Sequence, residues 1–390
     1  MNPKTAFLFT FLLLLALPAS SQDRDWTLAG YVKDLFMYYH PEPQIPGMAT
    51  ENLHLNTIHN RLNFEWVATK HLTVAIENRN RLISGNMVHY FSGYQSYIDT
   101  DNGYVDLSFV PLNGDSWFLH SMIDRAYVDW SSGSWQVRLG RQRVNWGLNL
   151  VWNPNDLFNS YSYFDFDYEE RPGTDALRVQ YYTGPTSSAE LVYQLGENTG
   201  EMALAALYRF SRLNYDIQLM SGWVGTDLVA GFGWAGDILG AGFRGEFSQF
   251  IPRKSKSESE SATVASVSAD YTFANSLYVH VSALYNSLGN NGTAASLSPI
   301  VNTNLSAKSL SFGKYELFAQ CSYPITPLFA ANASVIINPA DGSSYLGPAL
   351  NYSLQSNLEF MLSAQLFFGD HASEYGDIGQ LAFARLKWSF

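Results

Sequence analysis

Residues 381–390, LAFARLKWSF, alternate between two kinds of side chain with a period of two. One face would carry Ala382, Ala384, Leu386, Trp388 and Phe390, and the other Leu381, Phe383, Arg385 and Lys387. Because successive side chains of a strand point to opposite faces, this pattern predicts a β-strand and not a helix. What the two faces contact has to be decided from the rest of the chain.

The first residues, MNPKTAFLFTFLLLLALPASSQ, carry one lysine, an apolar run from Ala6 to Leu17 and small residues at positions 19–21. A charged start, a short apolar run and small residues before a cleavage point are typical of a secretory signal peptide. We therefore predict a signal peptide over residues 1–21 and one mature domain over residues 22–390. The apolar run is too short for a comfortable membrane-spanning helix.

The composition excludes several classes of protein. No later stretch approaches the roughly 18 apolar residues of a transmembrane helix. Charged residues make up only 15% and aromatic residues also 15%, whereas about a quarter of an ordinary soluble domain is charged. The single cysteine, Cys321, cannot form an intrachain disulfide, and the net charge of −12 without a long basic tract argues against a nucleic-acid partner.

About eighteen segments of alternating polarity follow from Trp26 onward, and their connections differ in length. Short ones such as SSGS (131–134) and TGPT (183–186) alternate with long ones such as 83–121 and 145–173. The pattern predicts an all-β fold: a transmembrane antiparallel β-barrel of about 18 strands, range about 16–18, with short periplasmic turns and long extracellular loops. An even strand number predicts both termini at the short-turn end, with the last strand paired to the first. A soluble β-sandwich would need linkers between several domains, and none appears.

Charged residues predicted to face the lumen cluster early in the chain. They are Arg61, Glu65, Glu77, Arg79, Arg81, Arg125, Asp129 and Arg138, with Arg141 and Arg143 at the lumen mouth. Opposed charges across a narrow lumen would filter polar solutes, although they could also only neutralise one another inside a plugged wall. The loop candidates Asp165, Asp167, Glu169 and Glu170 would narrow the lumen if their loop folds inward, and would be ordinary acidic loop residues if it stays outside.

The stretch 124–182 contains the motif GRQ-x-VNWG, followed by Pro-Asp and Arg-Pro-Gly elements. It resembles a family of Gram-negative outer-membrane porin-like β-barrels, among them alginate-export-type proteins. The motif residues are Gly140, Arg141, Gln142, Val144, Asn145, Trp146 and Gly147. The resemblance implies an outer-membrane pore. The aromatic C-terminal strand ending at Phe390 likewise resembles the signal that the barrel-assembly machinery reads.

Signs of catalysis are weak or absent. The sequence has no metalloprotease, phosphate-loop, dinucleotide or nucleophile-elbow motif. His280 and Ser282 share a strand face without an acidic partner, which favours a polar lumen pair over a catalytic one. His54 and His59 match no metal-ligand spacing, and we interpret them as ordinary exposed residues. We therefore predict no enzyme activity, no metal and no cofactor.

These observations predict a passive porin-like channel of the bacterial outer membrane for small polar solutes. The arginines suggest anionic solutes as the hypothesis to test. Expected partners are outer-membrane lipid, the barrel-assembly machinery and the solute, and a homo-oligomer is left open. The alternative is a non-conducting surface protein that displays loops 83–121 and 145–173 for adhesion or partner binding.

Overall fold

The structure is a computed structural model that describes residues 25–42, 52–91, 93–165, 173–253, 260–290 and 306–390. The expected signal peptide, residues 1–21, lies outside these residues. The first strands are β1 Trp26–His40, β2 Leu53–Thr69, β3 Leu72–Ser84, β4 Ser108–Gly114, β5 Trp117–Ser132, β6 Trp135–Gln142, β7 Thr174–Gly184, β8 Ser187–Gln194 and β9 Ala203–Arg212. They are followed by β10 Tyr215–Val224, β11 Asp227–Ile238, β12 Ala241–Pro252, β13 Ala262–Thr272, β14 Tyr278–Asn286, β15 Tyr315–Thr326, β16 Phe329–Ile337, β17 Ser344–Gln355, β18 Leu358–Phe368 and β19 Gln380–Ser389.

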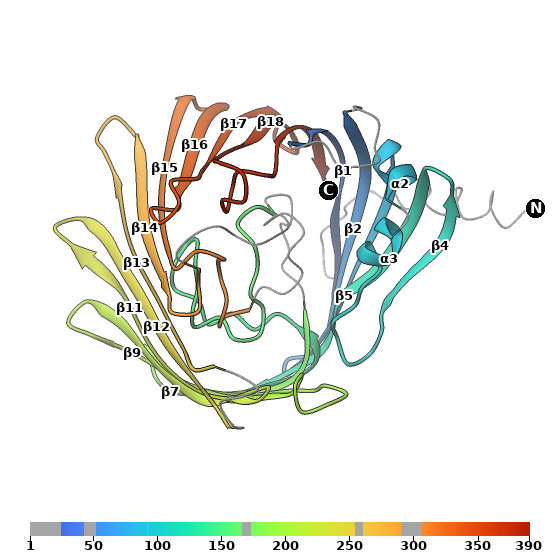
Figure 1. Cartoon of the computed structure of the whole chain (residues 1–390). Helices are drawn as coiled ribbons and strands as arrows, with labels where there is room; N and C mark the ends of the chain where they lie inside the picture. Colours follow the sequence, from blue (N-terminus) through green and yellow to red (C-terminus); the bar gives the residue numbers. More distant parts are fainter. Residues whose placement is uncertain (1–24, 43–51, 92, 166–172, 254–259, 291–305) are drawn as a thin grey trace, which may run out of the picture.

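The nineteen strands of the described residues belong to one sheet, in which each wall strand pairs antiparallel with its neighbours in the sequence. β1 also pairs with β19, from Tyr31 opposite Ser389 to His40 opposite Gln380, so the sheet closes into a barrel (Figure 1). β4 pairs only with β5. Each of the other eighteen described strands pairs with two neighbours among them, and these eighteen form the wall of the barrel. The expected antiparallel barrel, its strand number and the pairing of its last strand with its first are confirmed.

The connection expected over residues 83–121 contains regular structure that the sequence did not reveal. It holds the short helices α2 Asn86–Tyr90 and α3 Tyr94–Ile98, the strand β4 and the beginning of β5. β4 pairs only with β5 and contains Pro111, which cannot donate to a sheet ladder and is tolerated because this strand lies at an edge. Its register shifts between Phe109 and Leu112, which hides the alternation. No helix of the described residues is long and apolar enough to cross a membrane.

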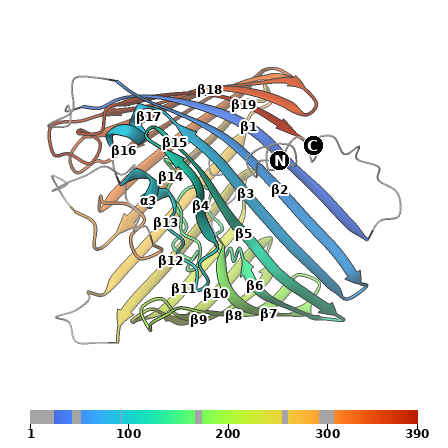
Figure 2. The same cartoon turned by 90° about the vertical axis from the view of Figure 1, so that its right-hand side faces the viewer.

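The two ends of the barrel differ, as the connection lengths predicted. Tight turns such as Gly133–Ser134 and Leu213–Asn214 join strands at one end, where β1 begins and β19 ends. The longer connections gather at the other end, and the strands run obliquely between the two (Figure 2). We call these the short-turn end and the long-loop end.

The two faces of the wall also differ. On β14, His280 and Ser282 lie on the inner face and are buried, whereas Val281 between them is 47% exposed on the outer face. Leu219 on β10 is likewise exposed outward while Gln218 is buried inside. An apolar outer face and a polar inner face are the arrangement that lipid outside and a polar lumen inside require.

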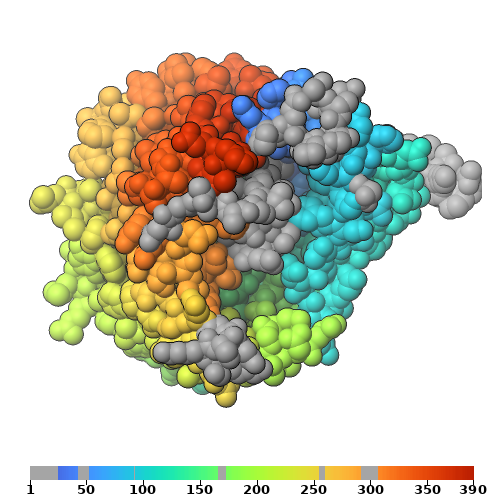
Figure 3. Space-filling model, viewed as in Figure 1, coloured from blue at the N-terminus to red at the C-terminus, as the bar shows by residue number. Residues whose placement is uncertain are grey.

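The buried core of this barrel lies inside the lumen, where connections from the long-loop end fold back between the walls. Trp146 and Trp152 of the β6–β7 connection pack in one apolar cluster with Phe318 of β15 and Tyr345 of β17. In the space-filling view, atoms of the orange and red part of the chain reach inward from the wall over the opening (Figure 3). The connections therefore decide how much of the lumen is open.

Candidate functional site

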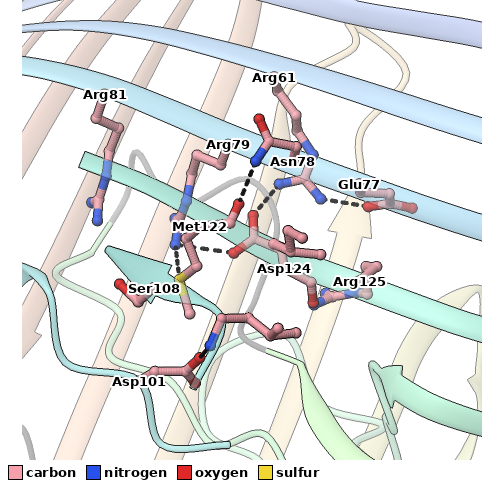
Figure 4. Close-up of polar contacts among 12 residues, drawn as sticks. Arg61, Glu77, Asn78, Arg79, Arg81, Asp101, Ser108, Met122, Asp124 and Arg125 are labelled. Carbon is pink, nitrogen blue, oxygen red and sulfur yellow. Dashed lines mark hydrogen bonds and ion pairs between the residues drawn. The ribbon is translucent and has the colours of Figure 1, made fainter. Parts of the chain in front are cut away.

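A cluster of ion pairs lies on the inner face of β2, β3 and β5. The guanidinium of Arg61 bonds both Asp124 and Glu77, and Arg79 Nη2 lies 3.1 Å from Asp124 Oδ1 (Figure 4). The side chains of Arg61 and Asp124 are 0% and 1% exposed. Three of the predicted residues, Arg61, Glu77 and Arg79, are thus brought together around a carboxylate that the sequence analysis did not single out.

Asp124 was missed because β5 departs from a period of two at this point. The register with β3 shifts between Glu77 and Asn78, which pair with Arg125 and Ile123, so that Asp124 is left without a direct partner. A bulge of this kind lets Asp124 and Arg125 both lie buried, although neighbouring residues of a regular strand point to opposite faces. Arg125 Nη1 donates to the Asp124 carbonyl at 2.8 Å. No alternation pattern identifies such a position.

A row of basic side chains crosses the inner wall next to this cluster. The register places Lys387 opposite Lys33, Lys33 opposite His59, His59 opposite Arg81, and Arg81 opposite His120. We call these five residues the basic row: Lys387, Lys33, His59, Arg81 and His120. It runs across β19, β1, β2, β3 and β5 and includes the seam where the barrel closes.

The members of the basic row differ in burial. Lys33 and His120 are 1% and 0% exposed, and Arg81 and Lys387 are half-buried. His59 is buried at 5% exposure, so our interpretation of it as an ordinary exposed residue is wrong. The interpretation failed because His59 shares the inner face of β2 with Arg61, two residues away. The alternation along β1 and β2 would have identified Lys33 and His59 as inner-face residues if the pairing of β1 with its neighbouring strands had been known.

Arg81 belongs both to the basic row and to the predicted lumen charges. Its Nη2 lies 3.1 Å from His120 Nδ1, and His120 Nε2 lies 2.7 Å from the Ser108 hydroxyl of β4. Asp99, at the end of α3, accepts from the same hydroxyl at 2.8 Å. The basic row is therefore joined through His120 to the segment that carries the two helices.

Arg141 and Arg143, expected at the lumen mouth, have different environments. Arg141 ends β6, and its guanidinium contacts Asp175 at 2.9 Å and Asp101 at 2.6 Å. It is 2% exposed, so it fastens the segment before β4 to the wall and is not an exposed charge at the mouth. Arg143 is half-buried, and the described residues give it no ion pair.

The remaining predicted wall residues lie nearer the short-turn end. Arg138 pairs with Asp129 at 2.6 Å and lies over the ring of Tyr127, 4.3 Å from its centroid. Glu65 is exposed and has no ion pair within the described part of the chain. Arg61, Glu77 and Arg79 therefore form one paired group and Arg138 and Asp129 a second, whereas Arg81 belongs to the basic row and Glu65 lies apart from all of these.

The β6–β7 connection, residues 143–165, folds into the lumen, and we call it the inward segment. Glu246 of β12, 1% exposed, accepts the backbone N–H groups of Leu148 at 2.5 Å, Asn149 at 2.7 Å and Asn155 at 2.9 Å. Trp146 Nε1 donates to Glu190 of β8 at 2.7 Å. Buried wall side chains thus replace the backbone hydrogen bonds that a crossing segment cannot make by itself.

Further contacts anchor the motif that the sequence singled out. Gln218 of β10 donates to the Trp146 carbonyl at 2.9 Å, and the Asn149 side chain lies between Ser266 and Ser268 of β13. A Cβ on Gly147 would lie 2.3 Å from Asn153 Oδ1, so only glycine fits there. Val144, Trp146 and Gln142 of the motif are all buried. These residues hold the inward segment in place.

The aromatic part of the acidic loop also lies inside the barrel. Phe164 lies 5.1 Å from Tyr345 and 5.5 Å from Phe367 between ring centroids, and Tyr163 lies 5.1 Å from Phe318. Asp165 follows and is exposed. The other loop candidates, Asp167, Glu169 and Glu170, lie outside the described residues.

The inward segment and the α2–α3 segment approach each other in the lumen. Burial, and next the carboxylate of Asp165, raise the pKa of Tyr97 in α3 above its usual value. Burial raises the pKa of its neighbour Tyr94 to about 12. Tyr94 packs edge-on against Phe118 of β5, at 6.2 Å between ring centroids. Two lumenal connections therefore meet near the inner wall that carries Arg81.

A further hydrogen-bonded cluster joins two connections of the long-loop end, one around Ser311 and one around Glu374. The Ser311 hydroxyl lies 3.0 Å from Glu316 Oε1 and 3.2 Å from Glu374 Oε1, and Asn338 donates to Glu374 at 2.7 Å. Tyr375 donates its phenolic proton to Glu316 at 3.2 Å. Burial, and next the charge of Glu316, raise the pKa of Tyr375 well above its usual value, so this phenol stays protonated.

Comparisons with known proteins were made for the sequence and for the fold. The sequence matches no protein-family model and no curated protein. Among solved structures, OccAB3 of Acinetobacter baumannii aligns with a TM-score of 0.62 and 10% identity over 94% of this chain and 99% of that chain. OprD of Pseudomonas aeruginosa aligns with a TM-score of 0.60 and 10% identity over 95% and 94%.

A third structure, OccAB4 of Acinetobacter baumannii, aligns with a TM-score of 0.58 and 9% identity over 96% of this chain and all of that chain. The fold is that of the OprD and Occ barrels. Identities this low show the fold alone, although the alignments cover at least 94% of each of these three barrels. The proposed function therefore has to be argued from the residues of this chain.

Proposed function

We propose that this protein is a channel of the bacterial outer membrane through which small anionic solutes, carboxylates in particular, diffuse passively. The basic row carries the proposal. Three fixed cations and two imidazoles follow one another in register across five adjacent strands of the inner wall. Cations placed side by side on a low-dielectric wall attract anions into the lumen and guide them along it.

The neighbouring charges support the same direction of selectivity. Asp124 and Glu77 both contact Arg61, and Asp124 also contacts Arg79. Each of these carboxylates is therefore balanced by arginine, and they do not cancel the charge of the basic row. Glu359 of β18 lies opposite Lys387 and offsets part of the charge of that one member. The predicted residues Arg61, Glu77, Arg79, Arg81, Arg125, Asp129 and Arg138 act in this proposal as wall and constriction residues.

The inward segment argues against the display alternative. An adhesin would need the 145–173 connection outside the barrel, whereas Trp146, Asn155 and Asp156 are buried within it. Wall residues far along the chain hold residues 146–155 of this connection inside the lumen. A connection held there narrows a passage, which is the role we propose for it.

The expected assembly route remains part of the proposal. Phe390 exchanges two backbone hydrogen bonds with Gly30, at 2.9 and 3.0 Å, so the terminal residue belongs to the closing seam. Recognition of this aromatic end by the barrel-assembly machinery is a hypothesis consistent with this position. The resemblance of residues 124–182 to alginate-export-type barrels is a separate hypothesis.

The proposal is tested by the reversal potential of the refolded mature protein in a planar bilayer across a salt gradient. We expect open steps with anion preference, reduced in the double variant Arg81→Met/Lys387→Met. The matched control Lys70→Met/Arg212→Met removes the same charge from two exposed positions at the short-turn end and should leave the potential unchanged. A folded but silent barrel would refute the channel, and an equal response of both double variants would refute the role of the basic row.

A further inference from the structure

Four turns of the short-turn end that follow one another along the wall carry an exposed apolar side chain. They are Leu213 between β9 and β10, Leu239 between β11 and β12, Phe273 between β13 and β14, and Leu328 between β15 and β16. We call these four residues the apolar rim. Leu239 is 99% exposed and Leu213 is 86% exposed, so neither packs against the chain itself.

The rest of the short-turn end is different. No leucine or phenylalanine stands at the tips of its other turns within the described residues, which are Lys70–His71, Gly133–Ser134, Pro185–Thr186 and Ser356–Asn357. The apolar tips are therefore confined to the adjacent strands β9 to β16, on one side of the barrel. Scattered exposed leucines are common on protein surfaces, whereas a contiguous apolar set usually marks a contact.

The backbone of two of these turns makes leucine an unfavourable residue in water. Leu213 and Leu239 have φ angles of 54° and 56°, in the left-handed region. Two-residue hairpin turns of this kind are usually built from asparagine, aspartate or glycine, because a bulky side chain is strained there. Asparagine would relieve the strain and would also be solvated by water. Leucine at both tips is therefore best explained by contact with apolar material outside the chain.

The apolar rim continues the lipid-facing surface of the wall. Ile238, which precedes Leu239 on the outer face of β11, is 46% exposed, and Ile325 near the end of β15 is 51% exposed. Tyr271 of β13 and Phe273 pack ring against ring, at 4.9 Å between centroids. On β11, β13 and β15 the apolar outer face thus runs to the turns. This continuity identifies lipid as the material that the rim contacts.

We propose that the apolar rim is inserted into the membrane leaflet at the short-turn end, so that the barrel lies deeper in lipid along β9 to β16 than along its polar-tipped side. Leucine and phenylalanine side chains are the ones that enter the boundary between headgroups and acyl chains. An apolar surface that extends further on one side is accommodated by tilting, so the rim fixes the direction in which the barrel tilts. The inference rests on the barrel lying in a membrane, and it does not depend on ion conduction.

The experiment places an environment-sensitive fluorophore on one cysteine of the mature protein, in a Cys321→Ser background and in phosphatidylcholine nanodiscs. Leu239→Cys is the test variant, and Thr186→Cys, in the β7–β8 turn, is the matched control. With nitroxide-labelled lipid we expect roughly three-fold stronger quenching at position 239 than at position 186, and the reverse order with iodide in the water. Folding of each variant is checked by heat-modifiable gel mobility. Equal quenching at both positions, or iodide access to position 239, would overturn the proposal and would favour a protein partner for the rim.

A double variant tests whether the leucines hold the rim in lipid. Leu213→Asn/Leu239→Asn suits the positive φ of both turns, so the hairpins should form as before while their apolar tips are lost. With the fluorophore at Leu328→Cys, we expect iodide quenching to rise about two-fold in this variant. Ser134→Asn/Thr186→Asn, on the polar-tipped side, is the matched control and should leave the signal unchanged. No rise in the leucine variant, or an equal rise in both, would overturn the proposal.

Discussion

Lys33 and Lys387 lie directly opposite each other across the seam that closes the barrel, and both ammonium groups lie over the ring of Tyr31. The Nζ atoms are 5.5 Å and 4.6 Å from the ring centroid. Like charges at directly opposed positions of a sheet are unfavourable, and the face of an aromatic ring offsets part of that cost. The two opposed ammonium groups therefore lower the stability of the seam. Attraction of anions to this wall would explain why both lysines are present.

The first prediction concerns this pair. Lys33→Met should stabilise the seam by roughly 0.2–1 kcal/mol, because one of two opposed charges is removed. Lys387 is less suitable, because it also lies opposite Glu359 and its loss would remove an attraction as well. Lys33→Met should also lower the anion preference of the channel. Both effects are measured on one preparation, by the temperature of heat-modifiable unfolding and by the reversal potential.

Arg385→Met is the matched control for that experiment. Arg385 lies opposite Leu35, so its loss relieves no opposed charge. We expect it to lower the anion preference without raising the unfolding temperature. A Lys33→Met variant that unfolds at a lower temperature than the native protein would contradict the argument.

A second prediction concerns the anchor of the inward segment. Glu246→Ala leaves three backbone N–H groups of residues 148–155 without their acceptor. A hydrogen bond contributes about 0.5–1.5 kcal/mol to stability, so the loss of three acceptor contacts should loosen this part of the segment from the wall. We expect larger, noisier conductance and faster proteolysis within residues 143–165.

Asp115→Ala serves as the control for the anchor, since Asp115 is exposed in the turn between β4 and β5. It should change neither conductance nor the cleavage pattern. If Glu246→Ala behaves like Asp115→Ala, the inward segment is held by its other contacts.

A third prediction concerns the buried carboxylate that joins two arginines. Asp124→Asn keeps the shape of the side chain but leaves Arg61 and Arg79 with less negative charge. Breaking a buried ion pair from one side costs about 3–5 kcal/mol, so the unfolding temperature should fall and the anion preference should rise. Asp129→Asn, which faces the half-buried Arg138, should show both effects more weakly. Equal effects of the two variants would argue against the buried cluster.

A fourth prediction concerns alkaline pH. Burial raises the pKa of Tyr375 well above the value of about 10 that the unfolded chain has. A raised pKa in the folded state gives stability that is present below about pH 10 and is lost as the pH rises further. Tyr375→Phe should therefore lose less stability between pH 9 and pH 11 than the native protein. Tyr104→Phe, at an exposed position, should keep the native dependence.

The sequence by itself determined the barrel and its two ends. Alternation such as that of residues 381–390 is local, because side-chain direction along a strand depends only on the parity of the position. Turn lengths are also local, and they predicted which end carries the termini. The same parity identified Arg61, Arg79 and Arg81 as residues of one face.

Only the tertiary structure decided which side chains meet. Lys33 and Lys387 become neighbours through closure of the barrel, and Asp124 turns inward at a bulge that breaks the parity on which the prediction relied. Glu246 binds the backbone of Asn149 from 97 positions away, across the lumen. Such contacts depend on how the closed wall and the folded connections share one interior, and no local pattern of residues encodes that arrangement.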